Sequence, residues 1–305
     1  MSDWDRLVDQ GLVRRNVRLD ALTTYKLGGA ARWYAEVSSY TDLARLGEAW
    51  AGVGESDVLV LGKGSNVIVA DRGYRGLVIR LVGEFLSIRH HALRIESGAG
   101  VGLPRLARSA VGEGRLGLEF MVGIPGTVGG GVYQNAGCHG KEMVDVLEEV
   151  EIFDLPAGHL QMMSPAALHL RYRASDVQPS QVVTRAWFGF SRGEQSVGLE
   201  RMRQITRWRR LHQPGGTLNA GSVFKNPPGD AAGRLIDDLG LKGLRVGKVR
   251  VSEKHANFFV AERGATSQDV RQLVERVRRL VRDATGIDLE PEIRFVGFSN
   301  EGVVV

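Results

Sequence analysis

Apolar and polar residues follow two different periods along the chain, and the two periods predict helices and strands in a mixed order. Helical spacing of apolar residues is found over 42–50, with Ser39 or Thr41 near the N-cap, and again over 104–111. The segments with the continuous or alternating apolar pattern of strands are 57–61, 88–97, 146–153 and 182–190. No internal repeat or low-complexity tract interrupts this order.

The pattern changes near residue 200, where a strongly basic amphipathic helix is predicted over 200–211. It ends at Gln213-Pro-Gly-Gly216, the clearest turn signal and therefore the best domain boundary in the sequence. Beyond this turn, the predicted elements are a helix over 231–239, a strand over 258–260 and a long helix over 269–284. This mixture favours the α+β class over a doubly wound parallel sheet.

Composition limits the kinds of protein that the chain can be. With 305 residues and ordinary apolar and charged fractions, it is long enough for about two domains with cores of their own. Cys138 is the only cysteine, which excludes an intrachain disulfide and a disulfide-stapled secreted domain. The acidic N-terminus has no apolar targeting segment, and no stretch is apolar for long enough to span a bilayer. We therefore expect a cytoplasmic protein.

Two glycine-rich segments are candidate phosphate-binding loops. The first, Gly62-Lys-Gly-Ser-Asn66, follows a predicted strand directly, so its backbone N–H groups can face a pyrophosphate without a Cβ in the way. Ser65 and Asn66 add side-chain donors. The third glycine and the helix start of a Rossmann fingerprint are missing, and taken alone the segment is more typical of a tight turn.

The second segment, Gly123-Ile-Pro-Gly-Thr-Val-Gly-Gly-Gly131, is the stronger phosphate candidate. Pro125 fixes the entry of the chain, Gly126 permits unusual backbone angles, and Thr127 is placed to cap a helix whose N-terminus attracts anionic oxygens. The alternative is a glycine-lined surface for helix packing. So dense a run of glycines is costly in chain entropy unless something approaches closely, which favours ligand contact.

Three distant segments supply groups that suit electrostatic and acid–base catalysis. They are Leu170-Arg-Tyr-Arg-Ala-Ser175, Asn219-Ala-Gly-Ser-Val-Phe-Lys-Asn-Pro227 and Leu289-Glu-Pro-Glu-Ile-Arg-Phe-Val-Gly297. They contribute a guanidinium at Arg173, a hydroxyl at Ser222 and a carboxylate at Glu292. Each group has an ordinary alternative, respectively a surface ion pair, a turn or capping hydroxyl, and a charge at the end of a strand.

Taken together and in this order, these segments resemble the signatures of the UDP-N-acetylenolpyruvoylglucosamine reductases, flavoenzymes of bacterial cell-wall precursor synthesis. The resemblance also covers both glycine-rich segments, Thr23-Thr-Tyr-Lys-Leu-Gly-Gly29, Asn135-Ala-Gly137 and Val251-Ser-Glu-Lys-His-Ala-Asn257. It implies noncovalent FAD, with NADPH as the cosubstrate. Because little chain separates Arg173 from Ser222, the sequence resembles the shorter type of the family, which lacks an inserted tyrosine loop.

The resemblance also implies a fold with definite boundaries. An FAD-binding half of the vanillyl-alcohol-oxidase (PCMH) type would occupy 28–193, with subdomains at about 28–80 and 81–193. An N-terminal segment, 1–27, would precede it, and a C-terminal α+β substrate domain, 194–305, would follow.

The family's functional residues fall on matching positions of this chain. The implied reaction adds a hydride from flavin N5 to the methylene carbon of an enolpyruvyl ether and a proton to the adjacent carbon. Arg173 would hold the carboxylate on which negative charge develops, and Ser222 would deliver the proton. Glu292, which fits the motif better than Glu290, would be protonated, paired with Arg173 or placed to hand over a proton.

The implied contacts of both ligands lie in the same motifs. For the flavin they are Gly62, Lys63, Gly64, Ser65, Asn66, Gly123, Ile124, Pro125, Gly126, Thr127, Gly129, Gly130, Asn135, Ala136 and Gly137. For the substrate they are Tyr172, Gln213, Lys225 and Asn226. The sequence departs from the family pattern at Cys138-His139. Because some flavoproteins attach flavin through histidine, His139 is an alternative covalent site, although the resemblance implies noncovalent binding.

Other functions are consistent with parts of the sequence. A PCMH-type FAD oxidase of another small substrate would not need the Ser222 and Glu292 motifs, and a noncatalytic nucleotide-binding module would lose Arg173. A nucleic-acid binder would interleave basic and aromatic residues, and only 201–210 resembles that. The formal net charge of +5 suits an anionic substrate or simply reflects an arginine-rich composition. We predict a monomeric reductase without nucleic-acid, membrane or metal partners.

Overall fold

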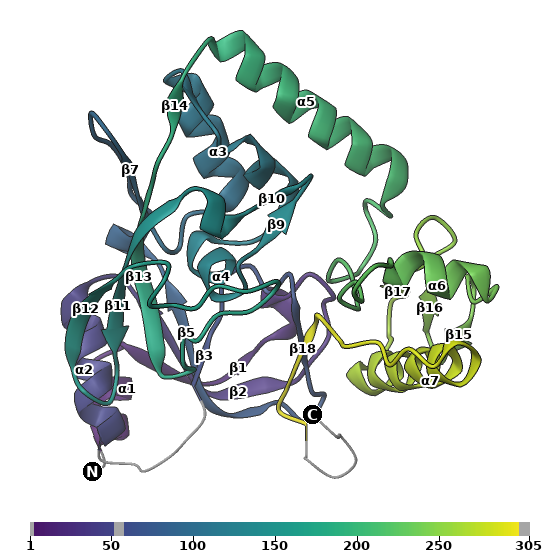
Figure 1. The fold of residues 1–305 in the computed structure, drawn as a ribbon. Helices are drawn as coiled ribbons and strands as arrows, with labels where there is room; N and C mark the ends of the chain where they lie inside the picture. Colours follow the sequence, from purple (N-terminus) through teal and green to yellow (C-terminus); the bar gives the residue numbers. More distant parts are fainter. Residues whose placement is uncertain (1–2, 52–57, 299–305) are drawn as a thin grey trace. The chain divides into compact units, whose positions relative to one another are not determined.

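The structure, a computed structural model that describes residues 3–51 and 58–298, separates into two compact units (Figure 1). Unit 1 comprises Met1–Asn16, Arg32–Lys63 and Arg75–Trp208. Unit 2 comprises Val17–Ala31, Gly64–Tyr74 and Arg209–Val305. Each unit encloses an apolar cluster of its own, so the chain has the two cores that its length predicts.

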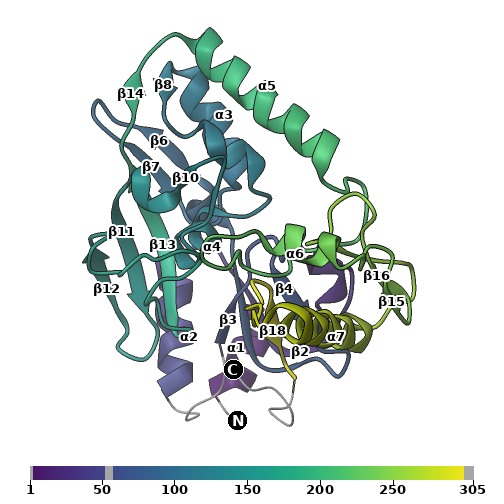
Figure 2. The same ribbon diagram turned by 45° about the vertical axis from the view of Figure 1, so that its right-hand side comes forward.

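The larger sheet of unit 1 is antiparallel and has the strand order β12-β11-β13-β7-β6, which can be followed in Figure 2. Its strands are β6 (Ile88–His90), β7 (Ile95–Gly98), β11 (Leu147–Asp154), β12 (His159–Met163) and β13 (Gln181–Phe188). The central strand β13 is buried along most of its length, whereas the edge strand β12 is largely exposed. The strand is mostly apolar, as a central strand requires, but Thr184 and Arg185 interrupt the apolar run, and the Arg185 guanidinium is paired with Glu96 at 2.9 Å.

A second sheet has the strand order β1-β2-β5-β3. Its strands are β1 (Val13–Arg18), β2 (Ala30–Val37), β3 (Val58–Val60) and β5 (Tyr74–Leu81), and the two helices near it in sequence are α1 (Asp3–Asp9) and α2 (Tyr40–Ala51). Leu43 and Leu46 of α2 are fully buried. The backbone N–H of Asp42 donates to the Ser39 hydroxyl at 3.2 Å. Of the two predicted candidates, Ser39 and Thr41, the structure therefore shows Ser39 as the N-cap of this helix.

Shorter elements complete unit 1. They are η2 (Gly83–Leu86), α3 (Leu103–Gly112), β8 (Arg115–Leu116), η3 (Glu119–Gly123), α4 (Val128–Tyr133), β9 (Gly137–Cys138), β10 (Lys141–Glu142), η4 (Met143–Asp145), β14 (Ser191–Arg192) and α5 (Gln195–His212), whose last turn is in unit 2. In α3, the buried residues recur at helical spacing from Leu103 to Val111. In α5, by contrast, only Gly198 and Met202 are buried, and the helix is strongly basic, with several apolar side chains that are partly or largely exposed.

Unit 2 is built around a long amphipathic helix, α7 (Ser267–Thr285), which contacts two strands of a small antiparallel sheet. The other elements are η1 (Asp20–Leu22), α6 (Ala232–Asp238), β15 (Arg245–Val246), β16 (Val249–Val251), β17 (Phe259–Ala261) and the parallel pair β4 (Val67–Val69) and β18 (Arg294–Val296). A capping box formed by Thr266 and Asp269 begins α7, and Gly286, with φ 76°, ends it.

The structure confirms the predicted helices and strands, with ends displaced by a few residues. The largest displacement is in α5, which begins at Gln195 rather than near residue 200. In the strand predicted over 57–61, β3 covers Val58–Val60, and Asp57 lies outside the described residues. The mixed content of helices and strands confirms the α+β class. The predicted domain boundaries remain predictions, because the two units are each assembled from separate stretches of chain.

Two searches of the described residues bear on the predicted partners. None of the helices described combines the length and the apolar character needed to cross a membrane. In the same part of the chain, no group of three or more histidine, cysteine, aspartate or glutamate side chains is arranged to hold a metal ion.

Candidate active site

Within unit 1, Gly62 and Lys63 of the first glycine-rich segment lie near the second segment. A Cβ placed on Gly62 would lie 2.4 Å from the Thr127 hydroxyl oxygen, so only glycine fits beside that residue. A Cβ on Gly102 would lie 3.5 Å from the Lys63 ammonium and 3.9 Å from the Gly126 carbonyl oxygen. Gly62 and Lys63 are therefore neighbours of the Gly126-Thr127 turn, although about sixty residues separate them in the sequence.

The helix predicted after Thr127 is present as α4, and Thr127 is its N-cap. The Thr127 hydroxyl accepts from the Gly130 N–H at 3.4 Å. The glycines of α4 divide between the two interpretations of this segment. Added Cβ atoms would press Gly129 against Ala99 and Gly131 against Met143, at 3.1 and 2.7 Å, which is the packing role. At Gly130, the nearest atom is the Thr127 hydroxyl at 3.5 Å, so a ligand has room to approach.

The backbone of the first glycine-rich segment suits an anion. Within the described residues, the N–H groups of Lys63, Gly64 and Ser65 have no protein acceptor. Gly64 adopts a φ of 58°, in the left-handed region that a loop of successive N–H donors requires, whereas Gly126 does not. A pyrophosphate satisfies such donors with several oxygens at once, so these residues fit the phosphates of FAD.

The third predicted flavin motif, Asn135-Ala-Gly137, leads into a tight hairpin of β9 and β10. The Asn135 amide is almost fully buried, with 1% of the residue exposed, and donates to the Glu142 carboxylate at 2.8 Å and to the Arg171 carbonyl at 3.1 Å. The Ala136 N–H donates to the Gly131 carbonyl at 2.8 Å, which ties the motif to α4. Gly137 must be glycine, because a Cβ would lie 2.4 Å from the Lys141 carbonyl oxygen across the hairpin.

Arg173 is held next to this hairpin. Its Nη2 donates to the Gly137 carbonyl and its Nη1 to the Glu142 carboxylate, both at 3.0 Å, and only 15% of its side chain is exposed. The guanidinium also lies 4.7 Å from the centre of the Tyr172 ring. The backbone of Arg173 is left-handed, with φ 56°, a conformation that costs energy in a residue other than glycine. Arg173 does form an ion pair, as its ordinary alternative supposed, but this pair is not on the surface. The loop holds Arg173 as a fixed, half-buried cation.

In unit 2, the Ser222 segment is flanked by two other predicted motifs. Ser222 is bridged to Phe258, and the backbone N–H of Val223 donates to the Asn257 carbonyl at 2.8 Å. The Asn257 side chain bonds both backbone groups of Phe224, at 2.9 and 2.8 Å. Val223 and Phe224 are buried in the core, whereas Ser222 is half-buried, and its hydroxyl has no protein partner among the described residues.

The motif of Glu292 lies on the other side of the Ser222 segment. The Glu292 N–H donates to the Val223 carbonyl at 2.7 Å, and the Glu292 carbonyl accepts from the Asn66 side chain at 2.9 Å. Asn66, Ser222 and Glu292 are thus neighbours along one backbone network. The carboxylate of Glu290 has a different contact, since it accepts from the Lys225 ammonium at 2.6 Å.

The remaining predicted substrate residues make structural contacts in unit 2. The Asn226 side chain accepts from the Ala232 N–H at 3.1 Å, at the start of α6, and the Gln213 side chain accepts from Arg209 at 2.7 Å. His255 accepts from the Asn257 N–H at 3.2 Å, and its pKa is lowered by burial and by the nearby Lys242, which keeps this nitrogen available as an acceptor.

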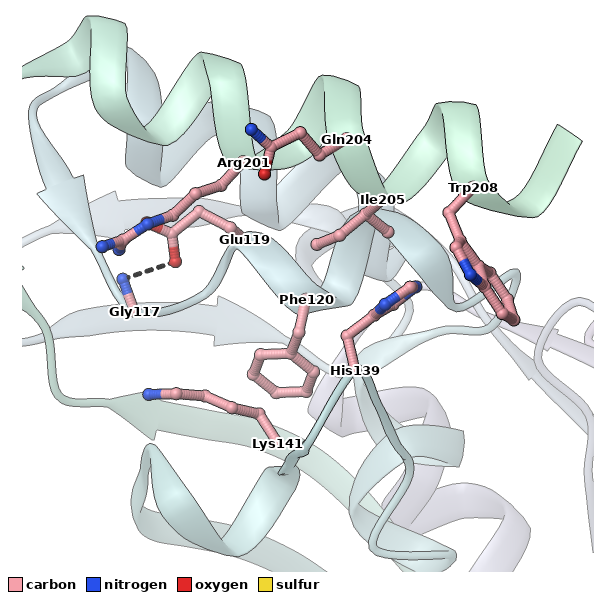
Figure 3. Close-up of a pocket in the computed structure, with 9 residues that line it drawn as sticks. All are labelled: Gly117, Glu119, Phe120, His139, Lys141, Arg201, Gln204, Ile205 and Trp208. Carbon is pink, nitrogen blue, oxygen red and sulfur yellow. Dashed lines mark hydrogen bonds and ion pairs between the residues drawn. The ribbon is translucent and has the colours of Figure 1, made fainter. Parts of the chain in front are cut away.

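A pocket of about 560 Å³ in unit 1 is lined by none of the predicted catalytic, flavin or substrate contacts, although His139, the alternative covalent site, is in its wall (Figure 3). Its walls come from η3, the β9–β10 hairpin and α5, and the residues that line it are Gly117, Glu119, Phe120, His139, Lys141, Arg201, Gln204, Ile205 and Trp208. The Glu119 carboxylate accepts from the Gly117 N–H at 2.8 Å and pairs with Arg201 at 3.4 Å. The cation of Arg201 is thus partly neutralised by Glu119.

Sequence reasoning missed the anionic partners of two predicted site cations, Arg173 and Lys225. Glu142 binds Arg173, and Glu290 binds Lys225, yet neither was predicted to touch the residue that it holds. Glu290 lies in the same motif as Glu292, whereas Glu142 lies five residues after the Asn135-Ala-Gly137 motif and 31 residues before Arg173, so no local pattern in the sequence pairs it with Arg173.

Comparisons with known proteins agree with this geometry. A family model described as "FAD binding domain" matches residues 34–164, and one described as "UDP-N-acetylenolpyruvoylglucosamine reductase, C-terminal domain" matches residues 213–296. The chain is 43% identical, over 290 residues, to UDP-N-acetylenolpyruvoylglucosamine reductase 2 of Symbiobacterium thermophilum, with 95% of this chain and 94% of that protein covered. These matches confirm the resemblance drawn from the motifs.

Solved structures show the same relationship. UDP-N-acetylenolpyruvylglucosamine reductase (MurB) from Thermus caldophilus is similar with a TM-score of 0.81 and 39% identity, covering 93% of this chain and 99% of that one. BBE-like 1 of Physcomitrella patens has a TM-score of 0.56 at 12% identity, with 92% and 88% covered, and shares the fold alone. Together with the FAD-binding match, these similarities confirm the predicted fold class.

Proposed function

Because the chain belongs to the UDP-N-acetylenolpyruvoylglucosamine reductase family and is an FAD-dependent oxidoreductase, we propose that it reduces the enolpyruvyl group of UDP-N-acetylglucosamine enolpyruvate. The product is UDP-N-acetylmuramate, a precursor of peptidoglycan, and NADPH is the electron donor. When bound, FAD accepts a hydride from NADPH and supplies one to the methylene carbon of the substrate. The other hydrogen of the product arrives as a proton, so the overall reaction consumes NADPH and one proton.

Arg173 is the group that we assign to the substrate carboxylate. Hydride addition at the methylene carbon pushes negative charge onto the conjugated carboxylate, and a fixed cation at that place stabilises the transition state. A guanidinium binds both carboxylate oxygens and stays charged. The anchoring of Arg173 on the Gly137 carbonyl at 3.0 Å is the observation that carries this proposal most directly, since Gly137 belongs to a predicted flavin motif.

Ser222 is the proposed proton donor to the carbon next to the carboxylate. Its half-buried hydroxyl has no protein partner among the described residues, and a stiff backbone network holds the segment that bears it. We assign Glu292 to support this step, either in its protonated form or as a relay that restores the serine proton. Its backbone is tied to Val223, the residue after Ser222, by a bond of 2.7 Å.

The remaining substrate contacts follow the predicted motifs. We propose that Tyr172, Gln213, Lys225 and Asn226 contact the sugar nucleotide. Lys225 is the best supported of the four, because only 19% of its side chain is exposed and its ammonium can exchange its bond with Glu290 for one with a phosphate. We further propose a cytoplasmic monomer that binds FAD noncovalently.

The experiment that tests this function separates the reaction into halves without oxygen. The purified yellow protein is mixed with NADPH, and the flavin absorbance near its visible maximum should disappear. Addition of the enolpyruvyl sugar nucleotide should then restore it, with formation of the lactyl ether. A reduced flavin that the sugar nucleotide fails to reoxidise, while oxygen reoxidises it rapidly, would instead support an FAD oxidase of another substrate.

A further inference from the structure

We propose that Glu142 is a positioning residue of the active site, which orients the guanidinium of Arg173 toward the carboxylate of the substrate. The inference rests on the role proposed above for Arg173. Glu142 lies 31 residues before Arg173 in the sequence, at the end of the β9–β10 hairpin, and no motif of the sequence had linked the two.

The first part of the argument is how Arg173 is fixed. One terminal nitrogen of its guanidinium is bound to Glu142 and the other to the Gly137 carbonyl, both at 3.0 Å. Glu142 and Gly137 are themselves paired across the hairpin. Two anchors on different nitrogens fix the plane of the guanidinium as well as its position. A guanidinium that grips a carboxylate with two bonds must lie nearly in the carboxylate plane, so this plane matters for the reaction.

The second part is how Glu142 itself is fixed. Its other carboxylate oxygen accepts from the Asn135 side chain at 2.8 Å, and Asn135 is 1% exposed. Asn135 cannot turn its amide over freely, because its oxygen accepts from the Val144 N–H at 3.0 Å. Glu142 also takes part in the capping box that begins η4, with Asp145 as the reciprocal partner. Asn135 and the capping box therefore fix the carboxylate of Glu142 independently of its bond with Arg173.

The chemistry of this arrangement requires a carboxylate rather than an amide. The two oxygens of Glu142 accept from Arg173 and from Asn135, and the side chain also accepts from the Asp145 N–H in the capping box. A glutamine has only one oxygen, so its NH₂ group would face one of these donors in either orientation. The exchange Glu142→Gln changes no side-chain length and so isolates this electronic requirement from packing.

The test is a comparison of rates between variants of the FAD-loaded enzyme. For Glu142→Gln, reoxidation of the reduced flavin by the enolpyruvyl sugar nucleotide should slow by about 10–10²-fold, the scale of a displaced catalytic group. Reduction of the flavin by NADPH should remain within about twofold of wild type. Glu142→Asp keeps the charge but has a shorter side chain, so its rate of reoxidation should fall between the rates of wild type and Glu142→Gln.

A double-mutant comparison shows whether Glu142 acts through Arg173. In a chain that already carries Arg173→Ala, the further change Glu142→Gln should slow reoxidation by less than about twofold, because the group that it positions is gone. If Glu142→Gln slows reoxidation by the same factor in the Arg173→Ala chain as in wild type, the proposal is overturned. A rate of Glu142→Gln within twofold of wild type, while Arg173→Ala is strongly impaired, would overturn it as well.

A binding measurement separates positioning from general damage. UDP-N-acetylglucosamine lacks the enolpyruvyl carboxylate, so its affinity for the oxidised enzyme, followed by the change in flavin absorbance, should be the same in Glu142→Gln and wild type. Loss of affinity for this ligand or of bound FAD would show a merely structural role and overturn the proposal. Asp176→Asn is the matched control, because it removes a nearby ion pair, with Arg171 at 2.8 Å, from the same loop.

The outcomes also distinguish this inference from the function on which it depends. If the wild-type flavin is not reoxidised by the sugar nucleotide, the proposed function fails. If wild type is active and Arg173→Ala is unimpaired, the role of Arg173 fails and the positioning role of Glu142 falls with it. If both Arg173→Ala and wild type behave as expected, the Glu142 variants decide the inference alone.

Discussion

In the proposed mechanism, Ser222 and Arg173 have different tasks and differ widely in chemical strength. Arg173 carries a permanent charge, and in its proposed role the placement of this charge alone would lower the energy of a developing anion. A serine hydroxyl is a weak acid and gives up a proton only to a strong base, such as the enolate-like carbon that hydride addition leaves behind. The structure suits this division, since Arg173 is anchored by two bonds and Ser222 is a half-buried hydroxyl without a described protein partner.

The change Ser222→Ala should therefore separate the two halves of the reaction. Reduction of the flavin by NADPH needs no proton from the serine and should stay nearly normal. Reoxidation by the enolpyruvyl sugar nucleotide should slow by about 10²–10⁴-fold, the usual contribution of a positioned general acid. Rapid-mixing absorbance follows both steps in one preparation, and Ser252→Ala serves as a control because Ser252 is a buried serine of the same unit.

Two results would contradict the acid role of Ser222. Equal slowing of both steps would mean that the variant disturbs the flavin or the pocket. Normal reoxidation would make water or Glu292 the source of the proton.

At the residue scale, the sequence predicted which side chains carry chemistry, but it did not predict which residues hold them in place. Arg173, Ser222 and Glu292 stand in recognisable motifs, whereas the bond between Glu142 and Arg173 joins residues from separate loops. Periodicity and local motifs describe neighbours along the chain. A contact of this kind depends on how a hairpin and a distant turn fold against each other, so only the three-dimensional structure shows it.

At the scale of elements, α4 combines two uses of glycine in consecutive residues. Gly129 and Gly131 allow close packing, and Gly130 lies open beside the cap residue Thr127. The sequence predicted the cap and the helix, because Thr127 precedes a run that can turn helically. It offered packing and ligand contact as alternatives, and the direction of each glycine, which decides between them, follows from helix geometry and from the neighbours of α4.

The change Gly130→Ala tests whether a ligand uses the open position. The protein itself accommodates the methyl group, and alanine in a helix is more stable than glycine by roughly 0.5–1 kcal/mol, so the flavin-free protein should melt at the same temperature or higher. If the phosphates of FAD lie close to Gly130 in the complex, the added methyl group should lower the affinity for FAD by about tenfold or more. Fluorescence titration of the flavin-free protein measures this affinity.

Gly112→Ala is the matched control for this variant. Gly112 is also helical, in α3, and a Cβ there would meet nothing within 4 Å. It should give the same gain in stability with unchanged affinity for FAD. An unchanged affinity in Gly130→Ala would remove Gly130 from the flavin contacts and leave α4 a packing element only.

At the scale of the whole molecule, two cores are assembled from interleaved stretches of one chain. Residues 17–31 and 64–74 belong to the same unit as the C-terminal third. Length and composition predicted two cores, and the order of strands and helices predicted the α+β class. The interleaving could not be predicted from periodicity, because a local pattern shows that a segment is buried without showing which core receives it.

The whole protein should be isolated with one noncovalent FAD, and this cofactor should stabilise it. The unpaired N–H groups of Lys63, Gly64 and Ser65 and the open position at Gly130 are the physical reasons, since they exist in the native state and are lost on unfolding. A ligand specific for the native state adds about 2.7 kcal/mol of stability at a free concentration of 100 Kd. The melting temperature of the flavin-free protein should therefore rise steadily as FAD is added.

Denaturation followed by filtration tests whether the flavin is noncovalent, and the yellow colour should pass into the filtrate. Colour retained on the chain would indicate covalent attachment. His139, which is exposed in the β9–β10 hairpin, would then be the first residue to examine. A colourless protein whose melting temperature does not respond to FAD would contradict the proposed flavin site as a whole.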